Sequence, residues 1–155
     1  MTTVAYADIA GLGGTDLGYT DWLEVTQDRV NLFADAVDDH QWIHVDPQRA
    51  ASGPFGAPIA HGFLTLSLLT HLDASIPKDM SRYEGVVMGV NYGFDKVRFV
   101  NPVKVGQRIR ATSVLTGVDL KDPNSLQVTR TLTVEVDGES KPAVVADWIT
   151  RLVYG

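Results

Sequence analysis

The sequence of 155 residues contains no cysteine. Disulfide bonds, thiolate zinc sites, iron–sulfur clusters and cysteine nucleophiles all need the cysteine sulfur, so the sequence excludes each of them. Long hydrophobic runs are also absent, since no stretch reaches the roughly 18 apolar residues of a membrane-spanning helix. The N-terminus lacks the basic start and the continuous apolar stretch of a signal peptide. We therefore expect a cytoplasmic protein that does not span a membrane.

Positive charge is scarce relative to negative charge. The chain has 13 Lys and Arg residues against 19 Asp and Glu residues, which gives a formal net charge of −6. A protein that neutralises nucleic-acid phosphates over a broad surface needs the opposite balance, so nucleic-acid binding is not expected. The length and the even composition, without repeats or low-complexity tracts, predict one domain over residues 1–155.

Apolar spacing and a capping signal predict three helices in the first half of the chain. Between Thr26 and Asp38 the apolar residues recur at i, i+3, i+4 and i+7, which is typical of an amphipathic helix. Asp46 followed by Pro47 resembles the start of a helix, so a short second helix is expected over residues 47–52. Residues 59–72 are apolar on nearly all sides and predict a buried central helix.

The second half of the chain changes to the alternation of β-strands. Long strands are expected over residues 85–100, 107–118, 125–137 and 143–154, and an N-terminal strand near residues 19–25. The predicted fold class is α+β: an antiparallel sheet of about five strands around one long central helix. Such a sheet leaves edge strands exposed, and pairing of two copies is a common way to cover them, so we expect a homodimer.

Acids and histidines cluster just after the first predicted helix. Asp38 and Asp39 lie at its C-terminal end, where the helix dipole favours cations instead, and His44 follows in an apolar setting. A turn there can bring the His44 imidazole close to a carboxylate, and such a pair can hold a water and move its protons. The alternatives are a solvated pair of acids and a core histidine bonded to a backbone carbonyl.

His61 and Gly62 form a second group at the start of the predicted central helix. A helix N-terminus presents unpaired N–H groups, and a glycine lets a substrate carbonyl approach the backbone, so this group could bind an oxyanion. Close packing of Gly62 against the sheet explains the glycine equally well.

Metal binding and covalent catalysis find less support. His40 and His44 have i,i+4 spacing with Asp46 nearby, but no His-Glu-x-x-His pattern occurs and a helix end interrupts the segment. No Gly-x-Ser-x-Gly elbow is present, so no serine is favoured as a nucleophile.

These residues together resemble the hydratase motif of MaoC-like, (R)-specific enoyl-CoA hydratases, which are hotdog-fold proteins of fatty acid metabolism. In that family an aspartate and a histidine five residues later form the catalytic pair, and a later Ile-x-His-Gly opens the central helix. The matching segments span about 30 residues, and the strand pattern is compatible with the family over nearly the whole chain. They are Phe33-Ala34, Asp39 through Pro47, Phe55-Gly56 and Pro58 through Leu64.

The resemblance implies reversible hydration of a trans-2-enoyl-CoA to an (R)-3-hydroxyacyl-CoA, without a cofactor or metal. Asp39 and His44 would be the acid–base pair, and the backbone N–H of Gly62 would bind the thioester oxygen. Further substrate-binding candidates are Gln41, Ile59, His61, Lys96 and Arg98. The commoner family pattern has Gly before the aspartate and Asn-Pro before the Ile/Leu-His, whereas this chain has Asp38, Gln41 and Trp42, which affects the expected pocket shape.

Lys96 and Arg98 alternate along a predicted strand and could meet the phosphates of coenzyme A. With Lys104, Arg108 and Arg110 they could form a basic entrance, or simply a solvated sheet face. An acyl carrier protein could replace coenzyme A as the thiol carrier. Two other hotdog functions stay open: cleavage of the thioester, and binding of an acyl thioester without turnover.

Overall fold

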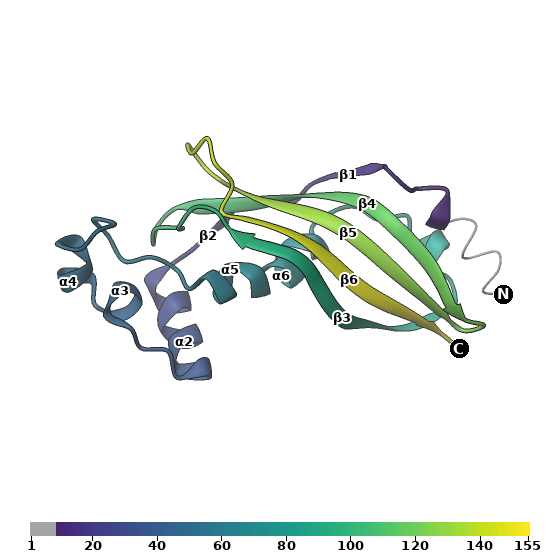
Figure 1. Ribbon diagram of the computed structural model, residues 1–155, viewed down its shortest axis with the longest axis horizontal. Helices are drawn as coiled ribbons and strands as arrows, with labels where there is room; N and C mark the ends of the chain where they lie inside the picture. The colour runs from purple at the N-terminus through teal and green to yellow at the C-terminus, as the bar shows by residue number, and fades with distance from the viewer. Residues whose placement is uncertain (1–8) are drawn as a thin grey trace.

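A six-stranded antiparallel sheet dominates the computed structural model, which describes residues 9–155 (Figure 1). The strand order is β1-β4-β5-β6-β3, and β2 also pairs with β4. The four long predicted strands are confirmed, whereas the expected N-terminal strand is two short strands. The strands are β1 (Asp16–Tyr19), β2 (Leu23–Glu24), β3 (Val86–Phe99), β4 (Arg108–Asp122), β5 (Ser125–Val136) and β6 (Val144–Tyr154).

The helices begin where the capping signals place them. The first predicted helix is α2 (Gln27–Val37), and the Thr26 hydroxyl accepts a hydrogen bond from the Arg29 N–H at 3.2 Å. The second is α4 (Pro47–Ala51), capped by the Asp46 carboxylate. Between them lies α3 (Trp42–Val45), a single helical turn in a segment where the sequence predicts no helix. A 3-10 helix, η1 (Met80–Tyr83), precedes β3.

The predicted central helix begins three residues later than expected and ends two residues later. Ile59 and Ala60 are extended, because Ile59 forms a β-bridge with Lys104 and the Ala60 N–H donates to the Val103 carbonyl at 2.7 Å. The helix follows as α5 (Gly62–Ser67) and α6 (Leu69–Ala74), with an irregular residue at Leu68 between them.

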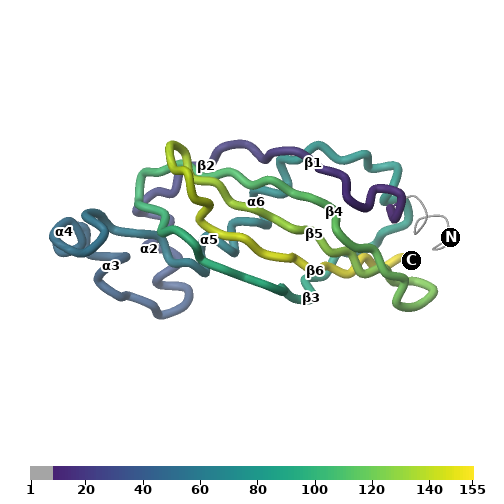
Figure 2. Tube along the Cα trace, turned by 45° about the horizontal axis from the view of Figure 1, so that its top comes forward, coloured from purple at the N-terminus to yellow at the C-terminus, as the bar shows by residue number. Residues whose placement is uncertain are grey.

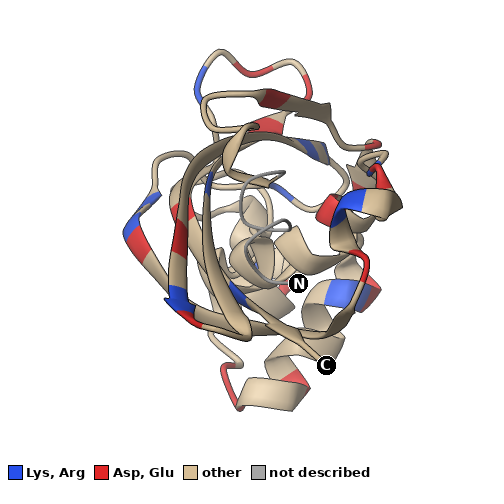
Figure 3. Ribbon diagram, turned by 90° about the vertical axis from the view of Figure 1, so that its right-hand side faces the viewer, with Lys and Arg blue, Asp and Glu red and all other residues tan. Residues whose placement is uncertain are grey.

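The core lies between this helix pair and the concave face of the sheet. Leu64, Leu68, Leu69 and Leu72 are buried against residues of β4, β5 and β6. Figure 2 shows α5 and α6 lying across the sheet, and Figure 3, viewed along the long axis, shows the strands curving round them. The helix therefore fills the hollow of the sheet, as the apolar pattern of residues 59–72 predicted.

Helices α2, α3 and α4 lie together beyond one end of the sheet, next to the start of α5 (Figure 1). This arrangement brings the acid–histidine segment to the N-terminal end of the buried helix. No helix among residues 9–155 is long and apolar enough to cross a membrane. The expectations about an N-terminal leader rest largely on residues 1–8, which lie outside the described residues.

Candidate active site

The end of helix α2 positions Asp39. Asp38 adopts a left-handed conformation with φ 57°, and the N–H groups of both Asp38 and Asp39 donate to the carbonyl of Ala34. This cap turns the chain sharply after α2. The Asp39 carboxylate is half exposed, with 50% of its side chain accessible, and accepts a hydrogen bond of 3.4 Å from the Gln41 N–H. The carboxylate is thus held locally while remaining open to solvent.

Helix α3 positions His44 across from this carboxylate. The His44 side chain is buried, and its Nδ1 lies 2.7 Å from the carbonyl oxygen of Ile59. A carbonyl oxygen can only accept, so Nδ1 carries the proton and Nε2 of the neutral ring keeps a lone pair. The Gln27 side chain of α2 donates to the His44 carbonyl at 2.8 Å and fixes α3 against α2. His44 is therefore bonded to a backbone carbonyl through Nδ1, as the core-histidine alternative expects, while Nε2 stays available for proton transfer.

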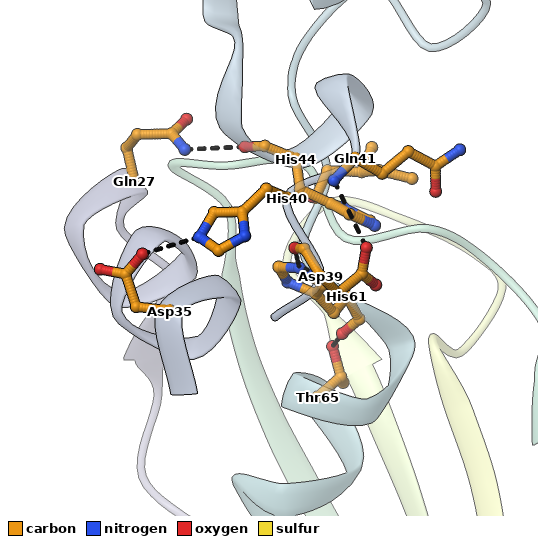
Figure 4. Close-up of polar contacts among 9 residues, drawn as sticks. Gln27, Asp35, Asp39, His40, Gln41, His44, His61 and Thr65 are labelled. Carbon is orange, nitrogen blue, oxygen red and sulfur yellow. Dashed lines mark hydrogen bonds and ion pairs between the residues drawn. The ribbon is translucent and has the colours of Figure 1, made fainter. Parts of the chain in front are cut away.

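His61 contacts both Asp39 and His44 (Figure 4). It is buried just before α5, and its Nε2 lies 2.9 Å from the backbone oxygen of Asp39 and 3.9 Å from the carboxylate. The rings of His61 and His44 stack with centroids 3.8 Å apart, and the Phe33 ring contacts His61 at a tilt, with centroids 5.1 Å apart. His61 Nδ1 is buried without a hydrogen-bond partner among the described residues. These contacts favour a role for His61 in holding Asp39 and His44 in position. The substrate-binding role of His61 stays a prediction.

One potential ligand atom from each of Asp39, His44 and His61 lies within 4.8 Å of the others. Two hydrogen bonds of about 2.8 Å can span such a separation, so a single water can bridge the carboxylate and an imidazole. The trio fits a metal less well. The two rings stack with an interplanar angle of 25°, so their in-plane lone pairs run side by side rather than converging on one ion.

A cavity of about 230 Å³ opens beside His44. Its lining includes Ile59, Gly62, Thr65 and Phe99. Gly62 is the first residue of α5, where backbone N–H groups have no acceptor within the helix. A Cβ at Gly62 would lie 2.9 Å from the Phe99 ring, so the glycine also permits close packing. His44 and Gly62 therefore line one cavity, and the Asp39 carboxylate lies next to His44 without being part of the lining.

The structure separates the other predicted site residues. The Gln41 side chain is exposed and points away from the imidazole rings in Figure 4. Lys96 is paired with Asp147 of β6 at 3.3 Å, and the alternation of Lys96 and Arg98 is interrupted by a register shift between Asp95 and Arg98. Arg108 and Arg110 lie on β4, which β5 and β6 separate from β3, and they pair with acids of β5 or the turn after it. Lys96 and Arg98 therefore do not lie on a strand adjacent to that of Arg108 and Arg110.

Burial lowers the pKa of His44 below its ordinary value of 6.5, and the nearby His61 ring lowers it further. The hydrogen bond to the Ile59 carbonyl and the Asp39 carboxylate act in the opposite direction but do not reverse the shift. His44 is therefore neutral at neutral pH, with Nε2 available to accept a proton.

The lowered pKa of His44 predicts a pH dependence of stability. In the unfolded chain this histidine takes up a proton near pH 6.5, while the folded chain takes it up at lower pH, so acidification through this window favours unfolding. We expect the free energy of unfolding, measured with urea between about pH 8 and pH 5, to fall more steeply for the wild type than for His44→Gln. Parallel curves would contradict a buried, neutral His44.

Comparison with known proteins identifies the family. The MaoC-like domain family matches residues 9–137. 3-Hydroxyacyl-thioester dehydratase Z of Mycobacterium tuberculosis is 53% identical over 152 residues, with 98% of each chain covered. Nodulation protein N of Rhizobium meliloti is 45% identical over 150 residues, covering 96% of this chain and 91% of its own.

Among solved structures, the (R)-hydratase of A. caviae superposes with a TM-score of 0.70 at 24% identity, covering 89% of this chain and 94% of its own. That likeness shows the same fold. The resemblance drawn from the sequence is confirmed: the chain is a hotdog-fold enzyme of the MaoC-like dehydratase family.

Proposed function

We propose that the protein catalyses the reversible hydration of trans-2-enoyl thioesters to (R)-3-hydroxyacyl thioesters, with Asp39 and His44 as the acid–base pair. The observation that carries this proposal is that the half-exposed Asp39 carboxylate lies within 4.8 Å of the neutral His44 imidazole, and that His44 lines a cavity together with Gly62. The name of the mycobacterial relative, a 3-hydroxyacyl-thioester dehydratase, supports the same reaction class.

The reaction needs a base, an acid and a place for the thioester oxygen. A water held between Asp39 and His44 attacks C3 as one of its protons passes to the pair, and a proton is delivered to C2. The C2=C3 π bond and one O–H bond of water break, while a C3–O bond and a C2–H bond form. Dehydration is the reverse. Because His44 is neutral, its Nε2 can accept a proton and return it in the same turnover.

Charge develops on the thioester oxygen as water adds to C3. A backbone N–H that points at this oxygen stabilises the enolate-like transition state more than the substrate. In this chain the Gly62 N–H takes that role, since Gly62 is the first residue of α5 and lines the cavity beside His44. The thioester would lie between Gly62 and the dyad, with C2 and C3 next to the bridging water.

The direct test is the loss of enoyl-thioester ultraviolet absorbance when the purified protein is added to crotonyl-CoA, in parallel with a free-thiol assay. Loss of absorbance without free thiol supports hydration. Release of thiol would indicate thioester cleavage, and binding without either change would indicate a non-catalytic acyl-binding protein. Repeating the assay with crotonyl carried on an acyl carrier protein identifies the preferred thiol carrier.

Gly62→Ala is expected to lower kcat. The new Cβ would meet the Phe99 ring at 2.9 Å, so either the ring or the start of α5 must move. Loss of one oxyanion donor costs about 10²–10³ in rate, which is the upper limit for this variant. Gly117→Ala in β4 is the matched control, because the nearest atom to its added Cβ, on Thr129, lies at an ordinary contact distance of 3.5 Å. Full activity in Gly62→Ala would show that catalysis does not depend on the exact placement of the start of α5.

We also propose that residues 1–155 form one domain that works as a homodimer joined through β3. This strand is 14 residues long, lies at the end of the sheet order and carries exposed apolar side chains, among them Val87, Met88, Val90 and Tyr92. A long apolar edge strand is prone to pair with another strand. A second copy of the same strand offers matching hydrogen-bonding groups and matching apolar surface.

The dimer proposal predicts a change of mass in solution. Replacement of Met88 and Val90 by lysine is expected to shift the protein from dimer to monomer in light-scattering chromatography, because like charges would face each other across the pairing edge. Lysine at Leu32, an exposed residue of α2, is the control. A monomeric wild type, or a variant that stays dimeric, would reject β3 as the interface.

A further inference from the structure

A second and larger cavity, of about 510 Å³, lies at the other end of the buried helix from the dyad. Thr70 and Asp73 of α6, Tyr83 of η1 and Arg130 and Trp148 of the sheet contribute to its walls. The cavity shares the helix, β3 and β6 with the smaller cavity beside His44. The two cavities therefore follow one another along the same helix–sheet interface.

The charged side chains around this second cavity do not balance. Among the described residues its charged lining consists of Asp73, Lys78 and Arg130. Arg130 is paired with one oxygen of the Asp73 carboxylate, and the Lys78 ammonium lies 2.8 Å from the other. Two cations thus share one carboxylate, which leaves a formal charge of +1. Arg130 is nearly buried, and a cation with reduced access to water favours an anionic neighbour.

Hydrogen-bond donors are also in excess. Both oxygens of Asp73 are engaged by the two cations, and the Asn91 side-chain oxygen accepts from the Trp148 indole at 3.1 Å. The guanidinium, the ammonium and the Asn91 amide carry more N–H groups than these bonds use. Burial raises the pKa of Tyr83, so its hydroxyl keeps its proton and can donate as well. A ligand that complements this lining must be rich in acceptors.

The remaining lining is apolar and includes Val86, Val128 and Leu152. A ligand that matches both parts of the wall has an aliphatic body and an anionic end. We propose that the cavity binds the carboxylate end of an aliphatic chain, with Lys78 and Arg130 as the recognition residues.

The carboxylate could come from either of two sources, and the first deepens the proposed function and rests on it. From Gly62 to Asp73 the helix advances by about 16 Å at 1.5 Å per residue, so the far end of a long, extended acyl chain could reach the cluster from the dyad. The substrates would then include enoyl thioesters with a terminal carboxylate. The second source is a separate fatty-acid anion.

The first experiment is calorimetric titration of octanoate into the wild type and three variants. Lys78→Gln removes the excess charge but keeps the Asp73–Arg130 pair, so octanoate affinity is expected to fall by about tenfold or more. Lys78→Arg should retain binding. Lys121→Gln, at the exposed end of β4, controls for loss of one positive charge and should bind as the wild type does. Absence of saturable binding, or equal affinity in Lys78→Gln, would overturn the proposal.

The second experiment compares hydration of two enoyl-CoA substrates of equal length, one ending in a methyl group and one in a carboxylate. A higher kcat/KM for the carboxylate substrate that disappears in Lys78→Gln assigns the site to the substrate's own chain. Octanoate binding without such a preference assigns it to a separate ligand, still a carboxylate. If no enoyl thioester is hydrated, the proposed function fails, while the octanoate titration still decides whether the cavity binds a carboxylate.

Discussion

Asp39→Asn and His44→Gln are each expected to lower kcat for crotonyl-CoA hydration by about 10²–10⁴-fold, the usual cost of losing a general acid or base. Asn keeps the shape of Asp39 and can still accept the hydrogen bond from the Gln41 N–H, but it cannot take a proton from water. Gln at position 44 can still donate toward the Ile59 carbonyl, but it lacks the basic nitrogen. Each variant therefore removes chemistry while preserving local bonds.

The double variant distinguishes a cooperating pair from two independent groups. If both residues act on one water, removal of either already abolishes the arrangement, and the double variant should be scarcely slower than the slower single variant. Multiplicative losses would mean separate roles. The value of kcat is measured from the loss of ultraviolet absorbance at saturating crotonyl-CoA, and circular dichroism verifies that each variant is folded.

His40→Gln is the matched control for these variants. His40 lies within the same segment, but its Nε2 is paired with Asp35 at 2.8 Å on the exposed side of α2. Its replacement should leave kcat unchanged, since surface ion pairs of this kind contribute little. Wild-type rates in Asp39→Asn or His44→Gln, or a large loss in His40→Gln, would refute the assigned dyad.

Much of this site could be predicted because its signals are local. The apolar spacing after Thr26 predicts α2. Asp39 and His44 come directly after this helix in the chain, so their closeness could be expected from the sequence. The strands alternate because one face of each covers the core, which gives a period of two in the sequence. Patterns that depend on neighbours along the chain are therefore visible before folding.

Other features depend on contacts between distant segments and leave no such pattern. His61 bonds to the backbone oxygen of Asp39, 22 residues earlier in the chain, and every residue carries the same carbonyl group. The single turn of α3 is too short to display helical periodicity, so residues 42–45 gave no helix signal. The support of the dyad by His61 could be found only once the chain was folded.

The end of the central helix illustrates the same limit with a charged residue. The apolar pattern of residues 59–72 predicts a helix that ends before Asp73. The structure instead continues α6 through Asp73 and buries that residue against Arg130 of β5, 57 residues later. A distant cation makes the burial tolerable, and no local rule could have supplied this partner.

Asp73→Leu is expected to lower the free energy of unfolding by about 3–5 kcal/mol, the cost of removing one partner of a buried ion pair. Arg130 would then keep its charge against the Trp148 ring, with little access to water and no carboxylate to compensate it. Lys78 is more exposed and can turn toward solvent, so the loss originates mainly from Arg130. Urea unfolding at one fixed protein concentration measures the difference, since association would otherwise alter the apparent stability.

The paired variant Asp73→Leu with Arg130→Met should recover most of this loss. It removes both buried charges together, and apolar side chains of similar size in place of a buried ion pair are often neutral or stabilising. Recovery would show that the pair costs as much in desolvation as it returns in attraction, so that stability alone does not require it. An ion pair with that balance would be free to serve recognition in the second cavity. Failure of the paired variant to recover would mean that Asp73 and Arg130 stabilise the fold through contacts other than their mutual charge.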